Sequence, residues 1–293
     1  MRARKISLRW PRPLRSVRVL VGGGIVLFVL LTAIFAPLLA PYDPNAQDLL
    51  NQLLPPVWAE GGNADFLLGT DNLGQDTLSR LIYGARVAMI VAILAAFGAM
   101  LLGTTLALIA GYFGGWVDWL ISRAVDLWMS FPPVVLSLIL IVGFGVGLSN
   151  VILAIVLVDW TRFCRVVRSE VLVVRRHDYI DAARLSGFSH LRTLVREVLP
   201  AVTPLIITLL SLEMAIALIV EAILSFVGMS VEADVPAWGV IIADARKNMY
   251  QAVWGLLLPI LAIVITVIGF NLLGDGLRRT LDPKLLQRQS AAA

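Results

Sequence analysis

Long apolar runs alternate along this chain with shorter segments rich in charge, proline and glycine. An uncharged run of about 18 residues or more can cross a hydrocarbon layer of about 30 Å as a helix. The fourth run is interrupted by Asp159 and Arg162, so we expect its last turns to leave the membrane. We predict an all-α integral membrane fold with six transmembrane helices, at Val19–Leu39, Val87–Ala110, Trp119–Val142, Leu148 to about Val166, Val202–Val227 and Val253–Leu273.

The positions of the basic residues orient these spans. Cytoplasmic loops of membrane proteins carry an excess of Lys and Arg. Of the 24 Lys and Arg residues, an alternating path places only Arg80, Arg86, Arg246 and Lys247 outside. Both termini are therefore predicted to be cytoplasmic.

The spans divide the chain into regions. We expect a basic cytoplasmic N-terminus at 1–18, a first span at 19–39, an external segment at 40–86, a core at 87–275 that contains a cytoplasmic loop at 167–200 and an external loop at 228–252, and a cytoplasmic tail at 276–293. In the external segment, Asp76 to Tyr83 is predicted as a short interfacial helix that Gly84 stops. A cleaved signal peptide is the alternative for the first 40 residues, but their apolar run exceeds the roughly 7–15 residues of a signal core.

The composition agrees with a membrane protein that binds lipid and no nucleic acid. The chain is 59% hydrophobic and 15% charged, whereas soluble domains are about 45–50% apolar and about 25% charged. Its mean hydropathy is +0.86 and its pI about 9.6. The basic residues flank apolar runs and do not gather on a polar face with aromatics, so membrane topology explains the positive charge better than nucleic-acid binding does.

The cytoplasmic loop has the sequence of a helical hairpin. Asp178 can cap a short helix with Asp181 at its third position, and Gly187 can end that helix in a left-handed conformation. Ser189 can cap a second helix, after which Pro200 starts the next span. The second helix has one apolar face, formed by Leu191, Leu194, Val195, Val198 and Leu199. Because connections in helical bundles are commonly about 2–8 residues, this long hairpin is predicted to be a docking element.

This hairpin resembles the coupling loop of ABC importer permeases. Asp181-Ala182-Ala183, Gly187 and Leu199-Pro200 are similar to the Glu-Ala-Ala, Gly and Leu-Pro positions of that family. The resemblance implies that the short helix sits in a groove of an ATPase subunit and transmits its closure to the membrane helices. The residues that it assigns to ATPase coupling are Tyr179, Asp181, Ala182, Ala183, Leu185, Gly187, Leu199 and Pro200.

Further segments narrow the resemblance to the C-type subunit of the dipeptide, oligopeptide and nickel permeases. They are residues 69–86, Asp126 with 130–133, 221–228, Trp238-Gly239, 271–278 and 281–283. Asp181 replaces the usual Glu of the family, Gln75 stands where Arg is common, and only Pro236 remains of the prolines before Trp238. The last two departures lie outside, so the substrate identity is the property that they put in doubt.

The resemblance implies a type I ABC importer transmembrane domain in a bacterial inner membrane. Its partners would be a homologous B-type permease subunit in a heterodimer, two ATPase subunits and an external substrate-binding protein. The cargo would be di- or oligopeptides, with nickel, glutathione or another small solute as the alternative. A secondary transporter driven by an ion gradient is the alternative from a different class.

The sequence lacks the means to bind ATP in a P-loop. That loop needs a Lys followed by Ser or Thr, whereas Lys5, Lys247 and Lys284 precede Ile, Asn and Leu. We therefore expect no cofactor in this chain, no enzyme activity of its own, and ATP and Mg used by partner subunits. No catalytic constellation is apparent, and two histidines on an arginine-rich loop make a poor metal site, so His177 and His190 are predicted to be solvated surface.

Several carboxylates are predicted to lie in or near the spans, where a lone charge costs about 2.5 kcal/mol or more and so faces a cavity or a partner. Asp126, Glu213 and Glu221 are the candidates for lining a translocation path. The alternative for each of them is a structural role, through hydrogen bonding between helices or protonation in place. It is favoured for Asp126, because Arg123 three residues earlier shares its helix face. Gly98, Gly103 and Gly111 would permit close helix contacts.

Overall fold

The computed structural model describes residues 16–232 and 234–281, and within these ranges the regular elements are all helical. Residues 1–15 of the predicted N-terminal segment and residues 282–293 of the predicted tail lie outside the described residues. The helices are α1 Val17–Ile34, α2 Ala36–Leu39, η2 Leu49–Asn51, α3 Thr77–Phe113, α4 Gly115–Trp128, α5 Pro133–Phe144, α6 Leu148–Val174, α7 Asp178–Leu185, α8 His190–Thr193, η3 Leu194–Val198, α9 Leu199–Phe226, α10 Trp238–Ala245, η4 Arg246–Asn248 and α11 Val253–Leu281.

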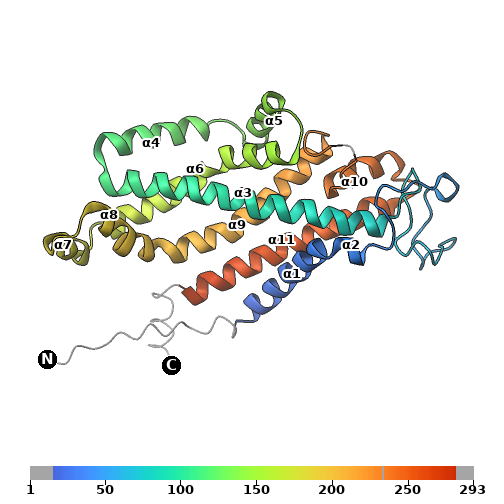
Figure 1. Ribbon diagram of the computed structural model, residues 1–293, viewed down its shortest axis with the longest axis horizontal. Coiled ribbons are helices and arrows are strands. Elements are labelled where there is room, and N and C mark those ends of the chain that lie inside the picture. The colour runs from blue at the N-terminus through green and yellow to red at the C-terminus, as the bar shows by residue number, and fades with distance from the viewer. Residues whose placement is uncertain (1–15, 233, 282–293) are drawn as a thin grey trace.

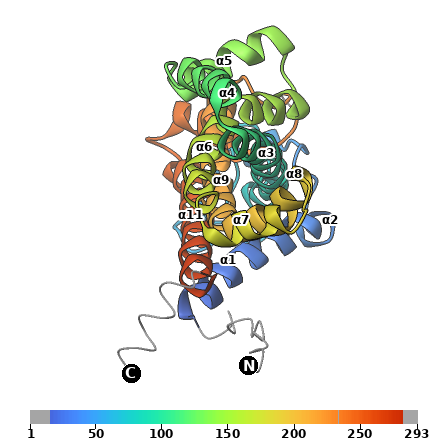
Figure 2. The same cartoon turned by 90° about the vertical axis from the view of Figure 1, so that its left-hand side faces the viewer.

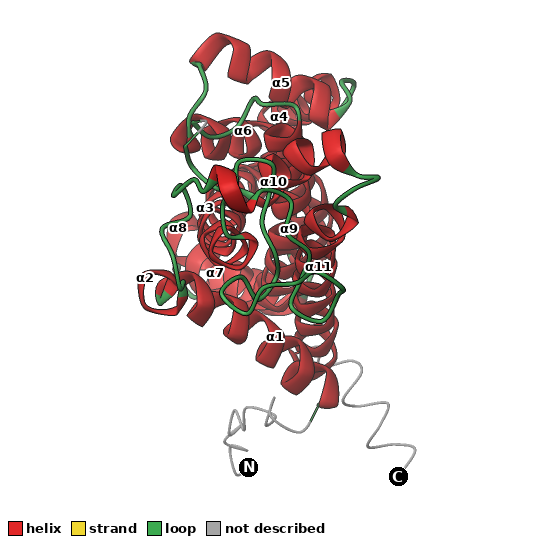
Figure 3. Ribbon diagram, turned by 90° about the vertical axis from the view of Figure 1, so that its right-hand side faces the viewer, coloured by secondary structure: helices red, strands yellow, loops and turns green. Residues whose placement is uncertain are grey.

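The helix α3 is the long central element of the bundle, and it packs against α6, α9 and α1 (Figure 1). The helix α11 packs between α1 and α9. The hairpin of α7 and α8 projects at one end of the bundle (Figure 2), whereas α2, α10 and the loops between α2 and α3 lie at the other end (Figure 3). The start of α1 and the end of α11 lie toward the hairpin end (Figure 1).

On length and composition alone, four described helical stretches can cross a membrane: α1, α3, the run His190–Phe226, and α11. The pair α4 and α5 is a fifth candidate. The helix α6 has 27 residues, which is long enough, but Asp159, Arg162 and Arg165 interrupt its apolar run. The transmembrane character of the fold agrees with the sequence, and the count of six remains a prediction.

The third predicted span is not one helix. It divides into α4 and α5, whose axes differ by 89° across the break at Met129 to Pro132. Pro132 and Pro133 cause the break, because each lacks a backbone N–H and disfavours a helical conformation in the residue before it. Pro133 then begins α5, a position where a missing N–H costs nothing.

The predicted interfacial helix is also wrong as a separate element. Asp76 caps a helix as expected, accepting a hydrogen bond from the Ser79 N–H at 2.8 Å, but the helix continues without a break to Phe113. Gly84 is buried inside it, where an added Cβ would lie 2.5 Å from Cδ1 of Trp238. Gly84 therefore makes room for a neighbouring ring and does not stop the helix. The first predicted span ends earlier than expected, at Ile34, and α2 follows it.

The glycines of α3 bring α6 close. A Cβ at Gly103 would lie 2.3 Å from the carbonyl oxygen of Trp160, and one at Gly98 or Gly111 would lie within 2.7 Å of a valine side chain of α6. The close contacts predicted for these three glycines are therefore present. Trp160 and Trp238 are buried in contacts with glycines of α3.

Candidate functional site

The turn between α7 and α8 has the geometry that the sequence predicts. Gly187 has φ +86°, which strains any residue with a side chain. The Phe188 N–H donates to the carbonyl of Ala183 at 3.2 Å and the Gly187 N–H to that of Arg184 at 3.0 Å. This pair of bonds is a Schellman motif, which ends a helix sharply. Ser189 caps α8, its hydroxyl accepting from the Arg192 N–H at 3.3 Å.

One detail of the predicted hairpin is wrong at its start. The N-cap of α7 is His177, with no side-chain capping bond, and Asp178 is the first helical residue. Asp178 and Asp181 still lie in the first turn, where their negative charge is favourable beside the positive end of the helix.

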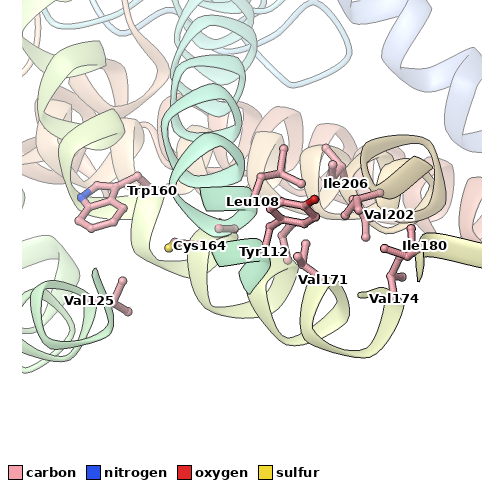
Figure 4. Close-up of a cluster of buried hydrophobic side chains, with 13 residues drawn as sticks. Leu108, Tyr112, Val125, Trp160, Cys164, Val171, Val174, Ile180, Val202 and Ile206 are labelled. Carbon is pink, nitrogen blue, oxygen red and sulfur yellow. The ribbon is translucent and has the colours of Figure 1, made fainter. Parts of the chain in front are cut away.

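The short helix α7 presents one apolar and one exposed face. Ile180 is buried in the cluster of Figure 4, among residues of α3, α6 and α9 such as Tyr112, Val174 and Val202. The side chain of Leu185 is 90% exposed at the tip of the hairpin, and Tyr179, Asp181 and Ala182 are exposed as well, whereas Ala183 is half-buried. Partial burial and the nearby carboxylate of Glu197 raise the pKa of Tyr179. These residues form an exposed helical knob that a partner groove could receive.

The second arm differs from the prediction. From His190 to Phe226 the chain is one continuous helical run, so Pro200 does not begin a new helix but lies in the second position of α9, where it is exposed beside half-buried Leu199. A π turn at Leu194–Val198 precedes it. Pro200 cannot donate a hydrogen bond and its ring crowds the carbonyl four residues earlier, which the wider π turn accommodates.

The predicted apolar face of this arm is only partly buried. Val198 is fully buried, and so is Thr193, which the pattern did not select. Leu191 and Val195 are 73% and 48% exposed. The π turn shifts the register of the helix, so residues spaced for one α-helical face no longer point in one direction.

Glu213 lies in a charged cluster between α6 and α9. Its Oε2 accepts from Nη1 of Arg162 at 3.0 Å, and Nη2 of Arg162 lies 3.6 Å from Oδ1 of Asp159. Glu213 and Asp159 are buried, whereas the Arg162 side chain is 35% exposed. The Oε1 atom of Glu213 is buried with no hydrogen-bond partner among the described residues. The spacing of three residues between Asp159 and Arg162 indicates that these two side chains can pair, but no sequence pattern indicates the bond between Arg162 and Glu213.

Glu221 and Asp126 lie apart from that cluster. Glu221 is buried and accepts hydrogen bonds from the hydroxyls of Ser225 and Ser230, so it ties the end of α9 to the segment that follows. Asp126 on α4 is exposed and pairs with Arg123 at 3.4 Å and with Arg165 of α6 at 2.7 Å. The Arg123 contact follows from the spacing, whereas the Arg165 contact was missed. The three predicted path carboxylates do not converge on one site.

The hairpin also contains contacts that no motif indicated. His177 and His190 are exposed, as predicted, but Nδ1 of His190 also lies 3.2 Å from the hydroxyl of Tyr112, and His177 stacks on Tyr179. Arg175, the C-cap of α6, donates to the backbone at the end of α3. The partners of His190 and Arg175 are more than 60 residues away in the chain, so no local signal indicates these two contacts, whereas Tyr179 is only two residues from His177.

A bundle of long apolar helices is the architecture of an integral membrane protein. The chain matches the family described as binding-protein-dependent transport system inner membrane component over residues 103–287, and the N-terminal TM domain of oligopeptide transport permease C over residues 9–56. It belongs to this family of ABC importer permeases, in the subgroup related to the dipeptide and oligopeptide C-type subunits.

Relatives of the chain cover nearly its whole length. The dipeptide transport system permease protein DppC of Escherichia coli is 41% identical over 93% of this chain and 91% of its own. The di/tripeptide transport system permease protein DppC of Pseudomonas aeruginosa is 38% identical over 95% of both. The glutathione transport system permease protein GsiD of Pectobacterium atrosepticum is 37% identical over 94% and 90%.

Proposed function

We propose that this chain is one half of the membrane pore of a peptide importer, energised by separate ATPase subunits that dock on its hairpin. The observation that supports this most directly is the exposed knob of α7, closed by the Schellman turn at Gly187, in a chain of the ABC importer permease family. In this proposal the hairpin end is cytoplasmic, and the opposite end, with α10 and the segment before α3, receives an external binding protein.

The proposed partner within the membrane is a homologous B-type permease subunit. Together the two chains would enclose the translocation path, and two ATPase subunits would bind the two hairpins. Closure of the ATPases on ATP would move the hairpins and tilt the membrane helices between outward-facing and inward-facing arrangements. In this scheme ATP and Mg are bound by the ATPase subunits, which agrees with the missing P-loop lysine here.

Glu213 is the carboxylate whose surroundings best suit a place beside the path. Its partner Arg162 is partly exposed, and a partly exposed guanidinium in a membrane helix requires a polar surface such as a cavity or a partner subunit. The contacts of Glu221 with two serines, and the exposed ion pairs of Asp126, give these two residues structural partners inside this chain.

Short peptides are the proposed cargo because the di- and tripeptide permeases are among the relatives with nearly full-length matches. A relative named for glutathione transport has similar identity, and glutathione is itself a small tripeptide-like solute. Glutathione is therefore the second candidate cargo.

The proposal is tested in the complex reconstituted into liposomes with its B-type subunit, its ATPases and its binding protein. Dipeptides, longer peptides, glutathione and nickel are supplied in turn to the binding protein, and both ATP hydrolysis and uptake are measured. We expect peptide to stimulate both. Stimulation by nickel alone would contradict the proposed cargo, and uptake driven by an ion gradient without ATP would contradict the importer.

The Gly187→Val substitution tests whether the hairpin performs the coupling. Valine is strained at φ +86° although nothing lies within 4 Å of the added Cβ, so the turn rather than the packing is affected. We expect normal membrane insertion and an uptake below about a tenth of the wild-type rate. Gly187→Asn, which tolerates this conformation better, is the control and should retain most of the uptake. Normal uptake by the valine variant would show that the hairpin is not the coupling element.

A further inference from the structure

The cytoplasmic end of α3 lies against both arms of the hairpin although it has no covalent connection to either. The first arm runs from Arg175, at the end of α6, through α7. The second arm begins with His190 in α8 and continues into α9. The chain alone would therefore transmit a displacement of α7 to α6 and α9. Any effect on α3 depends on noncovalent contacts.

Arg175 forms the first of these contacts. Its Nη1 donates to the carbonyl oxygens of Gly111 at 3.2 Å and Tyr112 at 2.9 Å. These are among the last carbonyls of α3, which have no partner within the helix. A cation at this end is also favoured by the helix dipole. Gly114, the residue that follows α3, has φ +69°, and a Cβ there would lie 2.9 Å from Nη1 of Arg175. Glycine at this position therefore leaves the space that the guanidinium needs.

The second contact joins the other arm to the same turn of α3. The hydroxyl of Tyr112 lies 3.2 Å from Nδ1 of His190 and donates to it when the imidazole proton is on Nε2. The imidazole also meets the rings of Tyr112 and Phe113, with centroids 5.8 and 5.9 Å away. Tyr112 itself is only 6% exposed and belongs to the apolar cluster that holds Ile180 of α7 (Figure 4). The last turn of α3 therefore contacts Arg175 and His190 directly, and it shares one apolar cluster with Ile180 of α7.

At its other end, about 55 Å away for a helix of 37 residues, α3 is attached to α10. Nε1 of Trp238 donates to the carbonyl of Leu81 at 3.0 Å, and Arg80 pairs with Asp244 at 3.5 Å and also with Asp71. A movement of the last turn of α3 would be transmitted along this helix to its contacts with α10.

We propose that Arg175 and the Tyr112–His190 pair clamp the hairpin onto the last turn of α3, so that the ATPase signal moves α3, and with it the α10 end, as one body with the hairpin. The proposal rests on the proposed function and identifies positioning residues outside the family motif. In this proposal the clamp stays closed while the hairpin moves.

The first test compares uptake per ATP hydrolysed in the reconstituted complex. We expect Arg175→Gln and Tyr112→Phe to lower this ratio at least three-fold while cargo still stimulates the ATPase. Arg175→Lys, which keeps a cationic donor, should restore at least half of the ratio. Arg176→Gln is the matched control, since Arg176 is the exposed neighbour of Arg175. Wild-type ratios in both clamp variants would overturn the proposal.

The second test holds the clamp closed covalently. Tyr112→Cys and His190→Cys are combined in a Cys164→Ala background, which removes the single native cysteine, and are joined by a short bifunctional thiol reagent. The unjoined double variant should have a lowered ratio, and joining should restore it at least two-fold. If joining instead abolishes uptake while the ATPases remain bound, α3 and the hairpin must separate during the cycle, and the clamp is wrong. A wild-type complex without ATP-driven uptake would instead refute the proposed function.

Discussion

Arg162 is shared by two buried carboxylates, Asp159 on its own helix and Glu213 on α9. Burying a charge in a membrane helix is costly, and an ion pair offsets this cost best when the remaining lone pairs are also hydrogen-bonded. Here one oxygen of Glu213 has no partner among the described residues. Arg162 therefore does not satisfy every carboxylate oxygen of the cluster. Removal of Arg162 would leave two buried carboxylates without a counter-charge.

We predict that Arg162→Met lowers the stability of the bundle by about 2–3 kcal/mol, somewhat less than the loss of one partner of a fully buried ion pair. Adding Glu213→Gln should recover part of this loss, because one of the stranded charges is removed. The melting temperature in detergent, followed by tryptophan fluorescence, measures both. Arg165→Met is the control, since its pair with Asp126 is exposed and worth about 1 kcal/mol or less. A double variant no more stable than Arg162→Met would contradict this account.

Residues whose conformation is decided locally could be found from the sequence. Gly187 and Ser189 have the predicted conformations because a left-handed turn and a helix cap depend on a few neighbouring atoms. The partner of Glu213, 51 residues earlier in the chain, and the partner of His190, 78 residues earlier, depend on how α3, α6 and α9 meet. No local pattern contains that information.

Among the helices, contact between α3 and α6 depends on glycines of α3, and Gly103 is the one that lies closest to the backbone of α6. At Gly103 the space for a side chain is occupied by the Trp160 carbonyl and by Cβ of Phe163. A backbone atom cannot rotate away as a side chain can, so the two helices would have to separate. Four of the spans were predictable from apolar length. The breaks were only partly predictable: two prolines bend one predicted span by 89°, whereas Pro204 and Pro259 remain inside α9 and α11.

Gly103→Ala should therefore destabilise the bundle although alanine is the better helix former. Its intrinsic helix propensity favours the folded state by about 1 kcal/mol, whereas overpacking a close contact costs about 1–3 kcal/mol. We expect a net loss of about 1 kcal/mol, seen as a lower melting temperature in detergent. Gly24→Ala in α1 is the matched control, because nothing lies within 4 Å of its added Cβ, and it should be neutral or stabilising. Equal effects of the two substitutions would refute the packing argument.

Across the whole molecule, the two ends of the bundle have different constructions. The hairpin end presents a short helix with an exposed apolar tip, and the other end is built of loops, short helices and the Arg80 ion pairs. Among the described helices, α3, α6, α9 and α11 have 27 or more residues each and run much of the distance between the two ends (Figure 1). A signal that enters at one end and alters the other must pass along these helices, which is why the attachment of the hairpin to α3 matters for transport.

Docking of the ATPase subunits on α7 can be tested at its most exposed apolar residue. Leu185 is 90% exposed, and burying a leucine in a partner groove contributes about 1.5–3 kcal/mol. Leu185→Asp should therefore weaken copurification of the ATPase subunits about ten- to a hundred-fold while the chain still inserts and assembles with its membrane partner. Leu50→Asp, 96% exposed at the opposite end, is the control and should copurify normally. If both variants retain the ATPases, α7 is not the docking helix, and the coupling role must be sought elsewhere on the hairpin end.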